Sequence, residues 1–178
     1  MRSFLTHLEC TYCKAIFSTE KPHRTCNKCS KVLFPRYDIE NAKKEINPTK
    51  ISTRTPTMWR YFEMLPIVNP DNIVTLGEGF TPILPIKNLG KSLDCSNLFI
   101  KDEGINPTSS FKARGLSAAV SKAKEFGLTK FTIPSAGNAA GALAAYCARG
   151  GMESNIFMPR DTPIANIKEV SIIGSNLT

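Results

Sequence analysis

The sequence has no long hydrophobic run. No uninterrupted apolar stretch approaches the roughly 20 residues that a helix needs to cross a bilayer, which excludes a membrane-spanning helix and a membrane partner. The first ten residues, MRSFLTHLEC, are too short and too polar for a secretory signal. The sequence therefore predicts a cytoplasmic protein.

Acidic residues are also scarce. The 178 residues contain 15 Asp and Glu against 23 Lys and Arg, so the formal net charge is +8 and the pI is about 9.3. This balance suits nucleic acid and small phosphate-bearing molecules equally, and net charge does not choose between them. The length allows one ordinary domain, or a small module followed by one domain.

Cysteine is used in two ways. Four cysteines form a CxxC…CxxC array with twelve residues between the pairs, and these are Cys10, Cys13, Cys26 and Cys29. Two such pairs supply four thiolates to one tetrahedral ion, so the spacing predicts a structural zinc ribbon. The alternatives are unrelated buried thiols or a redox CxxC. Cys95 and Cys147 stand alone, and we expect them to be inert packing thiols.

The predicted ribbon has a structural or docking role, because a closed four-cysteine site leaves no open position for catalysis. His7 and His23 are expected to be surface residues, since four sulfurs already complete the site. Tyr12 and Phe17 could stack on bases in this basic module. We expect them instead to be core residues, so nucleic acid is not an expected partner.

The chain divides into three parts in this interpretation. Residues 1–37 form the ribbon, residues 38–75 a linker with a short helix, and residues 76–178 the beginning of an enzyme domain. Residues 38–57 are polar, lack a sustained periodicity and are expected to run over the surface. In residues 58–67, a short helix would bury Trp59, Phe62 and Leu65.

Strands and helices alternate in the last part. Residues 97–101 are predicted as a buried strand, and residues 130–134 and 154–159 as two more. Helices are predicted from residue 111 to Gly127, from residue 138 to Gly151 and from residue 163 to Gly174. The alternation predicts an α/β fold with parallel β–α–β units, whose ligands bind beyond the carboxyl ends of the strands.

The segment Asn106 to Gly115, NPTSSFKARG, places Lys112 at the opening of one of these helices. The Asn-Pro pair is a turn signal, and Thr108, Ser109 and Ser110 are N-cap residue types. A cation is disfavoured at the positive end of a helix. Lys112 is therefore either a tolerated surface lysine or one that is kept for its nucleophilic amine.

Two further motifs flank this segment, and these are LGEGFTPI (residues 76–83) and PSAGNAAGALAAYCARGG (residues 134–151). Together the three motifs resemble the fold-type-II family of pyridoxal-phosphate enzymes, the tryptophan synthase beta-like family. Within it the chain is most similar to the archaeal-type branch of the threonine synthases, some of which carry an N-terminal ribbon. The resemblance implies a three-layer parallel-sheet architecture, pyridoxal 5'-phosphate as cofactor and an amino-acid substrate.

The resemblance also implies site residues. Lys112 matches the lysine that binds the cofactor aldehyde covalently and later transfers protons, and Phe111 matches the aromatic residue beside it. Asn138 matches the asparagine that hydrogen-bonds the phenolic oxygen of the cofactor. Ser135, Ala136 and Gly137 match the loop that receives the substrate carboxylate. The family reaction converts O-phosphohomoserine and water into threonine and phosphate.

The sequence departs from the family pattern at Ser109, where glycine is common, at Ala113, where aspartate is frequent, and at Ala136, where serine or glycine is frequent. The phosphate-cradling glycine loop and the residue facing the pyridine nitrogen belong to the C-terminal half of family members. Neither is found before Thr178, so we expect this chain to correspond to the N-terminal half, a fragment or split frame with an incomplete cofactor site.

Two other functions remain open at this point. One is a serine or threonine dehydratase, or a β-replacement enzyme, on the same scaffold. The other is a non-catalytic remnant that uses the ribbon as a binding module. Members of the family are often dimers, so a homodimer is among the expected partners.

Overall fold

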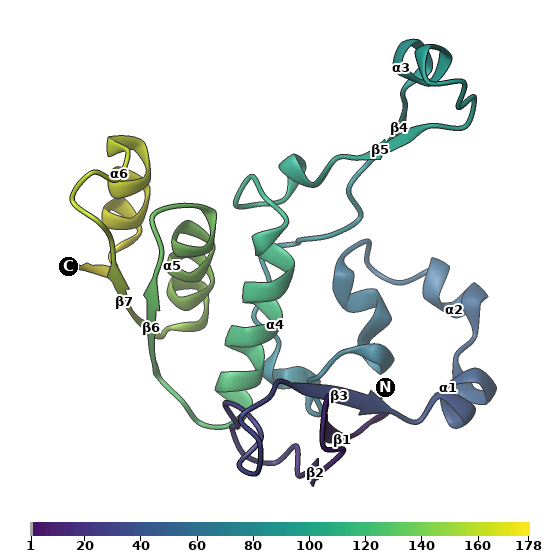
Figure 1. Ribbon diagram of the computed structural model, residues 1–178, viewed down its shortest axis with the longest axis horizontal. Helices are drawn as coiled ribbons and strands as arrows, with labels where there is room; N and C mark the ends of the chain where they lie inside the picture. Colours follow the sequence, from purple (N-terminus) through teal and green to yellow (C-terminus); the bar gives the residue numbers. More distant parts are fainter. Residues whose placement is uncertain (1) are drawn as a thin grey trace.

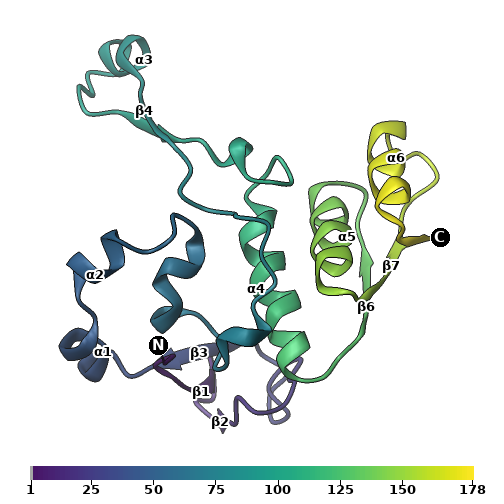
Figure 2. The same cartoon turned by 180° about the vertical axis from the view of Figure 1, so that it is seen from behind.

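The ribbon sheet occupies the N-terminal part of the computed structural model, which describes residues 2–178 (Figure 1). Its strands are β1 (Leu5–Cys10), β2 (Ile16–Phe17) and β3 (Leu33–Tyr37). They pair antiparallel in the order β2-β1-β3. The sheet lies at the C-terminal end of helix α4 (Lys112–Glu125), and both views of the molecule show this placement (Figures 1 and 2).

The segment that follows contains short helices that the sequence interpretation missed. They are α1 (Ile39–Glu45) and α2 (Pro48–Ser52). Asp38 caps the first by accepting from the Asn41 N–H, and Asn47 caps the second by accepting from the Thr49 N–H. Asp38 and Asn47 are typical N-cap residues, so both helix starts could have been predicted from the sequence. The expectation of a surface path is correct, since Ala42 is the only residue of the two helices that is buried.

The predicted short helix is present as the 3₁₀ helix η1 (Met58–Met64), which is followed by η2 (Pro70–Asn72). Trp59 and Phe62 are buried in one cluster with Met58 and Ile67, and Leu65 packs against them while remaining half-buried. The prediction that this stripe forms core is therefore confirmed.

A hairpin arm projects from the rest of the molecule (Figure 1). It consists of β4 (Ile83–Pro85), α3 (Lys87–Ser92) and β5 (Phe99–Lys101), and the two strands pair antiparallel. The prediction of a strand at residues 97–101 is correct, but its burial is wrong, because every residue of β5 is exposed. An apolar run predicts a strand without saying what covers it, and within residues 2–178 β5 pairs only with β4.

The C-terminal part has the predicted α/β order. After η3 (Glu103–Ile105) and α4 come β6 (Lys130–Pro134), α5 (Asn138–Gly150), β7 (Glu153–Phe157), α6 (Ile164–Ile173) and β8 (Asn176–Leu177). The strands form a parallel sheet in the order β6-β7-β8. Gly127, Gly151 and Gly174 adopt positive φ at the helix ends, as their predicted role as stops requires. The α/β class is thereby confirmed.

The core of this part lies between α4 and α5 and behind the parallel sheet. One cluster joins Val120 of α4 to Leu143 and Tyr146 of α5, and a second joins α5 to Ile156 and Val170. The small residues of α5 permit this packing on several sides.

The two isolated cysteines differ. Cys147 is fully buried, and this burial raises the pKa of its thiol to about 12, in agreement with an inert packing role. Cys95 is exposed, so the same expectation is wrong for it. Its position on the arm explains the difference, because the arm packs few of its side chains. None of the helices in residues 2–178 combines the length and the apolar character that crossing a membrane would require.

Candidate active site

Lys112 is the first residue of α4, as predicted. Its side chain is half-buried, and the Nζ atom lies 4.2 Å from the centroid of the Phe111 ring. None of the ion pairs found in residues 2–178 includes Lys112. Within residues 2–178 the amine therefore lies beside an aromatic face with no carboxylate in ion-pair contact, and the positive end of the helix dipole opposes its charge.

The loop that leads into Lys112 is tightly folded and holds unpaired hydroxyls. Ser109 adopts φ +50°, a left-handed conformation that is uncommon for a residue other than glycine, and its N–H donates to the Asn106 carbonyl over 2.7 Å. Thr108 Oγ1 and Ser110 Oγ are both buried without a hydrogen-bond partner among residues 2–178. An unsatisfied buried hydroxyl is costly, so two in one loop mark it as a candidate binding segment.

A charged brace fixes this loop to the base of the arm. Arg114 of α4 pairs with Glu103 through two hydrogen bonds of 2.6 and 2.8 Å. Glu103 also accepts from Thr81 Oγ1 and from the side-chain amide of Asn106, and Asn106 in turn accepts from the Gly79 N–H. The Arg114 guanidinium lowers the pKa of Glu103 to about 2, so the brace stays ionised at neutral pH.

Glu78 is a second, fully buried carboxylate that sequence reasoning did not assign. It accepts hydrogen bonds from Trp59 Nε1 of η1, from the Ser117 hydroxyl of α4 and from the Tyr146 hydroxyl of α5, at 2.7, 2.5 and 2.7 Å. Burial alone would raise the pKa of Glu78, but the bonds from Ser117 and Tyr146 outweigh it and the pKa lies below its ordinary value. The sequence signal that could have indicated this residue is its position between two glycines in LGEGF.

Asn138 is the first residue of α5 and directly follows the loop 135–137 at the carboxyl end of β6. The loop is held from both sides, because the Ser135 N–H donates to the Phe157 carbonyl and Asn166 Nδ2 donates to the Ala136 carbonyl. The Asn138 side chain is exposed and, within the described part of the chain, makes no hydrogen bond. The N-cap residue, Gly137, supplies no side-chain cap, which leaves the amide end of α5 open to an acceptor.

The structure brings these two segments to one end of a helix pair. Helices α4 and α5 pack side by side, and each begins at its upper end in Figures 1 and 2. No hydrogen bond joins Lys112 directly to the loop 135–138 within residues 2–178. The predicted parallel β–α–β arrangement holds for the strand before Asn138 but not for the strand before Lys112, because β5 belongs to the arm and pairs antiparallel with β4.

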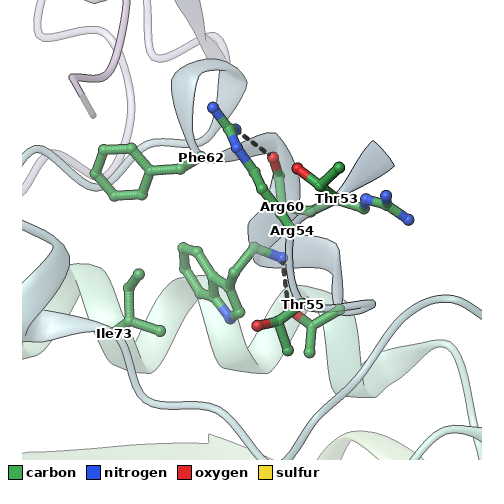
Figure 3. A pocket seen from close by; sticks show the side chains of 8 residues that line it. Thr53, Arg54, Thr55, Arg60, Phe62 and Ile73 are labelled. Atoms are coloured by element: carbon green, nitrogen blue, oxygen red, sulfur yellow. Dashed lines mark hydrogen bonds between the residues drawn. The ribbon is translucent and has the colours of Figure 1, made fainter. Parts of the chain in front are cut away.

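A cavity of about 410 Å³ lies beside η1, whose residues Trp59, Arg60 and Phe62 form part of its lining. Phe62 and Ile73 line one side of it, and Arg54 and Thr53 lie opposite (Figure 3). Trp59 also lines this cavity while its indole nitrogen bonds to Glu78. The cavity is thus separated from the Glu78 network by a single residue and contains neither Lys112 nor Asn138 in its lining.

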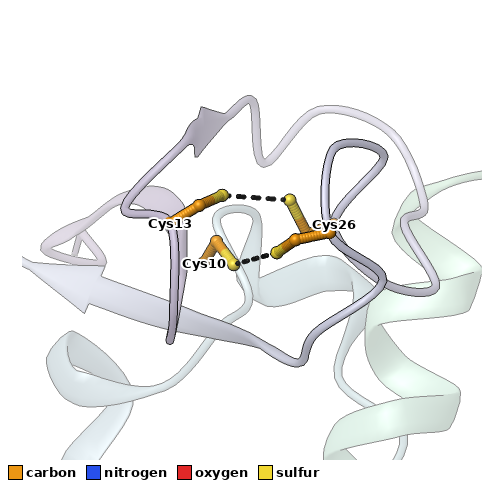
Figure 4. Close-up of side chains that lie close together, drawn as sticks. Cys10, Cys13 and Cys26 are labelled. Carbon is orange, nitrogen blue, oxygen red and sulfur yellow. Dashed lines mark hydrogen bonds between the residues drawn. The ribbon is translucent and has the colours of Figure 1, made fainter.

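The four predicted metal ligands converge in the ribbon (Figure 4). The sulfur atoms of Cys10, Cys13, Cys26 and Cys29 all lie within 4.8 Å of one another. Cys10 and Cys29 are separated by 3.3 Å between sulfurs, and Cys13 and Cys26 by 3.5 Å. A tetrahedral zinc site with Zn–S distances near 2.3 Å places its sulfurs about 3.8 Å apart, so the cluster has the dimensions of a possible metal site.

The neighbouring side chains of the ribbon are placed partly as expected. His23, which was expected at the surface, is half-buried, and its ring meets the half-buried Phe17 edge-on, with centroids 5.3 Å apart. The core expectation for Phe17 is therefore met only in part. The core prediction for Tyr12 is wrong, because this side chain is 74% exposed. Tyr12 lies in the turn between Cys10 and Cys13, outside the paired strands of the sheet.

Comparison with known proteins decides the family. The sequence model of the family "Pyridoxal-phosphate dependent enzyme" matches residues 74–178, more than half of the chain. The chain belongs to this family. It is also 37% identical over 153 residues to the threonine synthase of Methanosarcina acetivorans and 37% identical over 150 residues to that of Methanocaldococcus jannaschii, which covers 86% and 84% of this chain. It spans 37% of the length of each of these relatives.

Solved structures of the family agree with this assignment. An L-serine ammonia-lyase from Rhizomucor miehei matches 55% of this chain and 31% of its own with a TM-score of 0.50 and 32% identity. A pyridoxal 5'-phosphate-dependent aspartate racemase matches the same share of both chains with a TM-score of 0.52 and 25% identity.

The residues described above suit part of the cofactor of this family. The Lys112 amine has no carboxylate partner, and the buried hydroxyls of Thr108 and Ser110 have no hydrogen-bond partner within residues 2–178. A group that carries an aldehyde and several oxygen acceptors would use both features.

Proposed function

We propose that this chain carries the lysine segment of a pyridoxal-phosphate-dependent enzyme with threonine synthase activity, which converts O-phosphohomoserine and water into threonine and phosphate. The observation that carries the proposal is the position of Lys112 at the start of α4, inside the region that matches the family. Its amine makes no ion pair with a carboxylate of residues 2–178. Support for the reaction comes from the threonine synthases to which the chain is similar.

In this proposal the cofactor supplies an electron sink when bound, and the protein supplies positions and protons. Lys112 holds the cofactor aldehyde and moves a proton at its Nζ atom. The side-chain amide of Asn138 donates to the phenolic oxygen of the cofactor without adding charge. The loop Ser135, Ala136 and Gly137 receives the substrate carboxylate, because the N-terminus of α5 behind it attracts an anion.

The test is covalent trapping on the full 178-residue chain. Pyridoxal phosphate is added, the adduct is reduced with borohydride, and the labelled peptide is identified by mass spectrometry. We expect label on Lys112, and we expect Lys112→Ala to lose the adduct absorbance. Lys168→Ala, which removes an exposed lysine of α6, serves as the matched control and should keep it. Label spread evenly over surface lysines, unchanged in Lys112→Ala, would refute the proposal.

A dehydratase is the second candidate, because solved structures named threonine deaminase and L-serine ammonia-lyase share the fold of this chain. Release of phosphate from O-phosphohomoserine supports the synthase, whereas ammonia released from plain serine or threonine supports the dehydratase. Both assays are to be run on protein that has been shown to form the cofactor adduct, since neither reaction is expected without it.

We also propose that Cys10, Cys13, Cys26 and Cys29 hold one structural zinc ion. Support comes from the donor set and from the sulfur–sulfur distances between the two CxxC pairs, which are 3.3 Å for Cys10 and Cys29 and 3.5 Å for Cys13 and Cys26. The Lys28 N–H also donates to Cys26 Sγ over 3.4 Å, a hydrogen bond that favours the thiolate a metal requires. The division into a ribbon at 1–37, a linker at 38–75 and an enzyme part at 76–178 forms part of this proposal.

A further inference from the structure

The ribbon sheet turns one face towards the body of the molecule and leaves the other free. In the register of the sheet, Ile16 and Phe34 lie on either side of Glu9, in one row across β2, β1 and β3. Ile16 is 69% exposed and Phe34 is 51% exposed. The neighbouring row faces the other way, because Leu8 and Pro35 line a cavity together with Phe126 beyond the end of α4.

Two more exposed side chains follow this row along the chain. Tyr12 lies in the turn between Cys10 and Cys13, and the Thr11 N–H of that turn donates to the Val32 carbonyl. Val32, like Tyr12, is exposed. We call the four residues Tyr12, Ile16, Val32 and Phe34 the ribbon face. An exposed group of this kind on a small module marks an interaction surface rather than a core.

The ribbon as a whole is strongly basic. Residues 1–37 contain seven Lys and Arg against two Asp and Glu. Glu9 is shared by Arg36 at 2.6 Å and Lys14 at 3.5 Å, so one cation remains in excess there. Three further cations take part in none of the ion pairs of residues 2–178, and these are Arg24, Lys28 and Lys31. Lys21 lies on the opposite side, where it lines the cavity with Leu8 and Pro35. Four thiolates around a divalent metal would remove only part of this positive charge.

We propose that the ribbon face binds single-stranded nucleic acid, with Tyr12 and Phe34 stacking on bases and the surrounding lysines and arginines contacting phosphates. Exposed aromatic rings inside a basic field are the features that recognise unpaired bases on a charged backbone. A second copy of this chain fits less well, because two equally basic faces repel each other. An acidic peptide would satisfy the charges but would leave two exposed rings without a role.

The test uses the full chain loaded with zinc and a fluorescently labelled oligothymidylate of about 12 nucleotides, followed by anisotropy. Affinity should fall as salt rises, with a logarithmic slope of about −0.7 for each phosphate contacted. Tyr12→Ala and Phe34→Ala should each weaken binding roughly tenfold, since each removes one stacking platform. Tyr61→Ala is the matched control, because Tyr61 is 51% exposed but lies outside the ribbon, and it should bind normally.

Zinc content and circular dichroism are measured for each variant. If Phe34→Ala loses its metal, the test rests on Tyr12→Ala alone, because removing this exposed ring should not disturb the fold of the ribbon. Absence of binding would overturn the proposal, as would an equal loss in Tyr61→Ala. Full competition by polyglutamate, combined with normal binding by Tyr12→Ala, would also overturn it and would assign the surface to acidic peptides by charge alone. The proposal is independent of the reaction, so failure of cofactor trapping leaves it standing.

Discussion

Two carboxylates, Glu78 and Glu103, hold the segments on either side of Lys112. Glu103 anchors the loop before it through Arg114 and Asn106, while Glu78 anchors α4 five residues after it through Ser117. Buried charge is costly unless its hydrogen bonds are complete. The complete set around Glu78 therefore orients three elements at once, which gives the start of α4 little freedom to move.

This role predicts a large effect of a small change at Glu78. Glu78→Gln keeps the shape but replaces one acceptor oxygen by an NH₂ group facing donors such as Trp59 Nε1 and the Tyr146 hydroxyl. We expect the free energy of unfolding to fall by roughly 2–3 kcal/mol, the range for hydrogen bonds to a charged group. Urea denaturation followed by circular dichroism measures it.

The matched control for this change is Glu40→Gln. Glu40 is an exposed carboxylate whose ion pair with Lys43 lies on the surface of α1. Exposed pairs contribute little, so the free energy of unfolding should change by less than about 0.5 kcal/mol. Equal losses in both variants would mean that Glu78 is no more than another acidic residue of the chain.

At the scale of elements, the loop between Thr75 and Thr81 contacts both η1 and α4. The Met58 N–H donates to the Glu78 carbonyl over 2.8 Å, so the loop and η1 touch through their backbones. This approach requires glycine at position 79, where φ is +101° and a Cβ atom would lie 2.4 Å from the Met58 nitrogen. The two glycines in LGEGF are thus not equivalent.

The difference between these glycines is testable. Gly77 also has a positive φ, of +90°, but a Cβ atom there would meet nothing within 4 Å. Gly77→Ala should therefore cost only the backbone strain of about 1–2 kcal/mol. Gly79→Ala adds a clash with backbone that no rotamer relieves, so we expect a loss of more than about 3 kcal/mol or failure to fold. Similar stability of the two variants in urea would contradict the close approach.

At the scale of the whole molecule, the features that could be predicted are those that depend on residues close together in the sequence. Features that depend on long-range contacts could not be predicted. Glycine stops and the strand–helix alternation gave α4, β6, α5, β7 and α6, because these depend on residues near each other in the chain. The exposure of β5 and of Tyr12 could not be predicted in this way, since it depends on what the fold brings against them. The start of α4 was predictable to within a residue from NPTSSFK, but the predicted cap is wrong, because Phe111 occupies the N-cap and no side chain caps the helix. The brace was not predictable, because Glu103 and Arg114 look like ordinary surface charges in the sequence.

The link between ribbon and body yields the last prediction. The ribbon buries only a few side chains, among them Cys10 and Cys26, so its fold should depend on the metal. Its first strand is tied to η1, because the Phe4 N–H donates to the Glu63 carbonyl and the Ser3 hydroxyl to the Leu65 carbonyl. Loss of metal should therefore loosen η1, which carries the single tryptophan of the chain.

Chelation of the zinc-loaded chain should release about one zinc ion per molecule and shift the emission of Trp59 to longer wavelength. Far-ultraviolet circular dichroism should retain most of its helical signal, because α4, α5 and α6 pack around a core of their own. Cys13→Ser should reproduce the chelated state. Cys95→Ser should keep both metal and emission, since Cys95 lies on the arm. An unshifted emission after complete metal loss would mean that the ribbon is tethered to the enzyme part without supporting it.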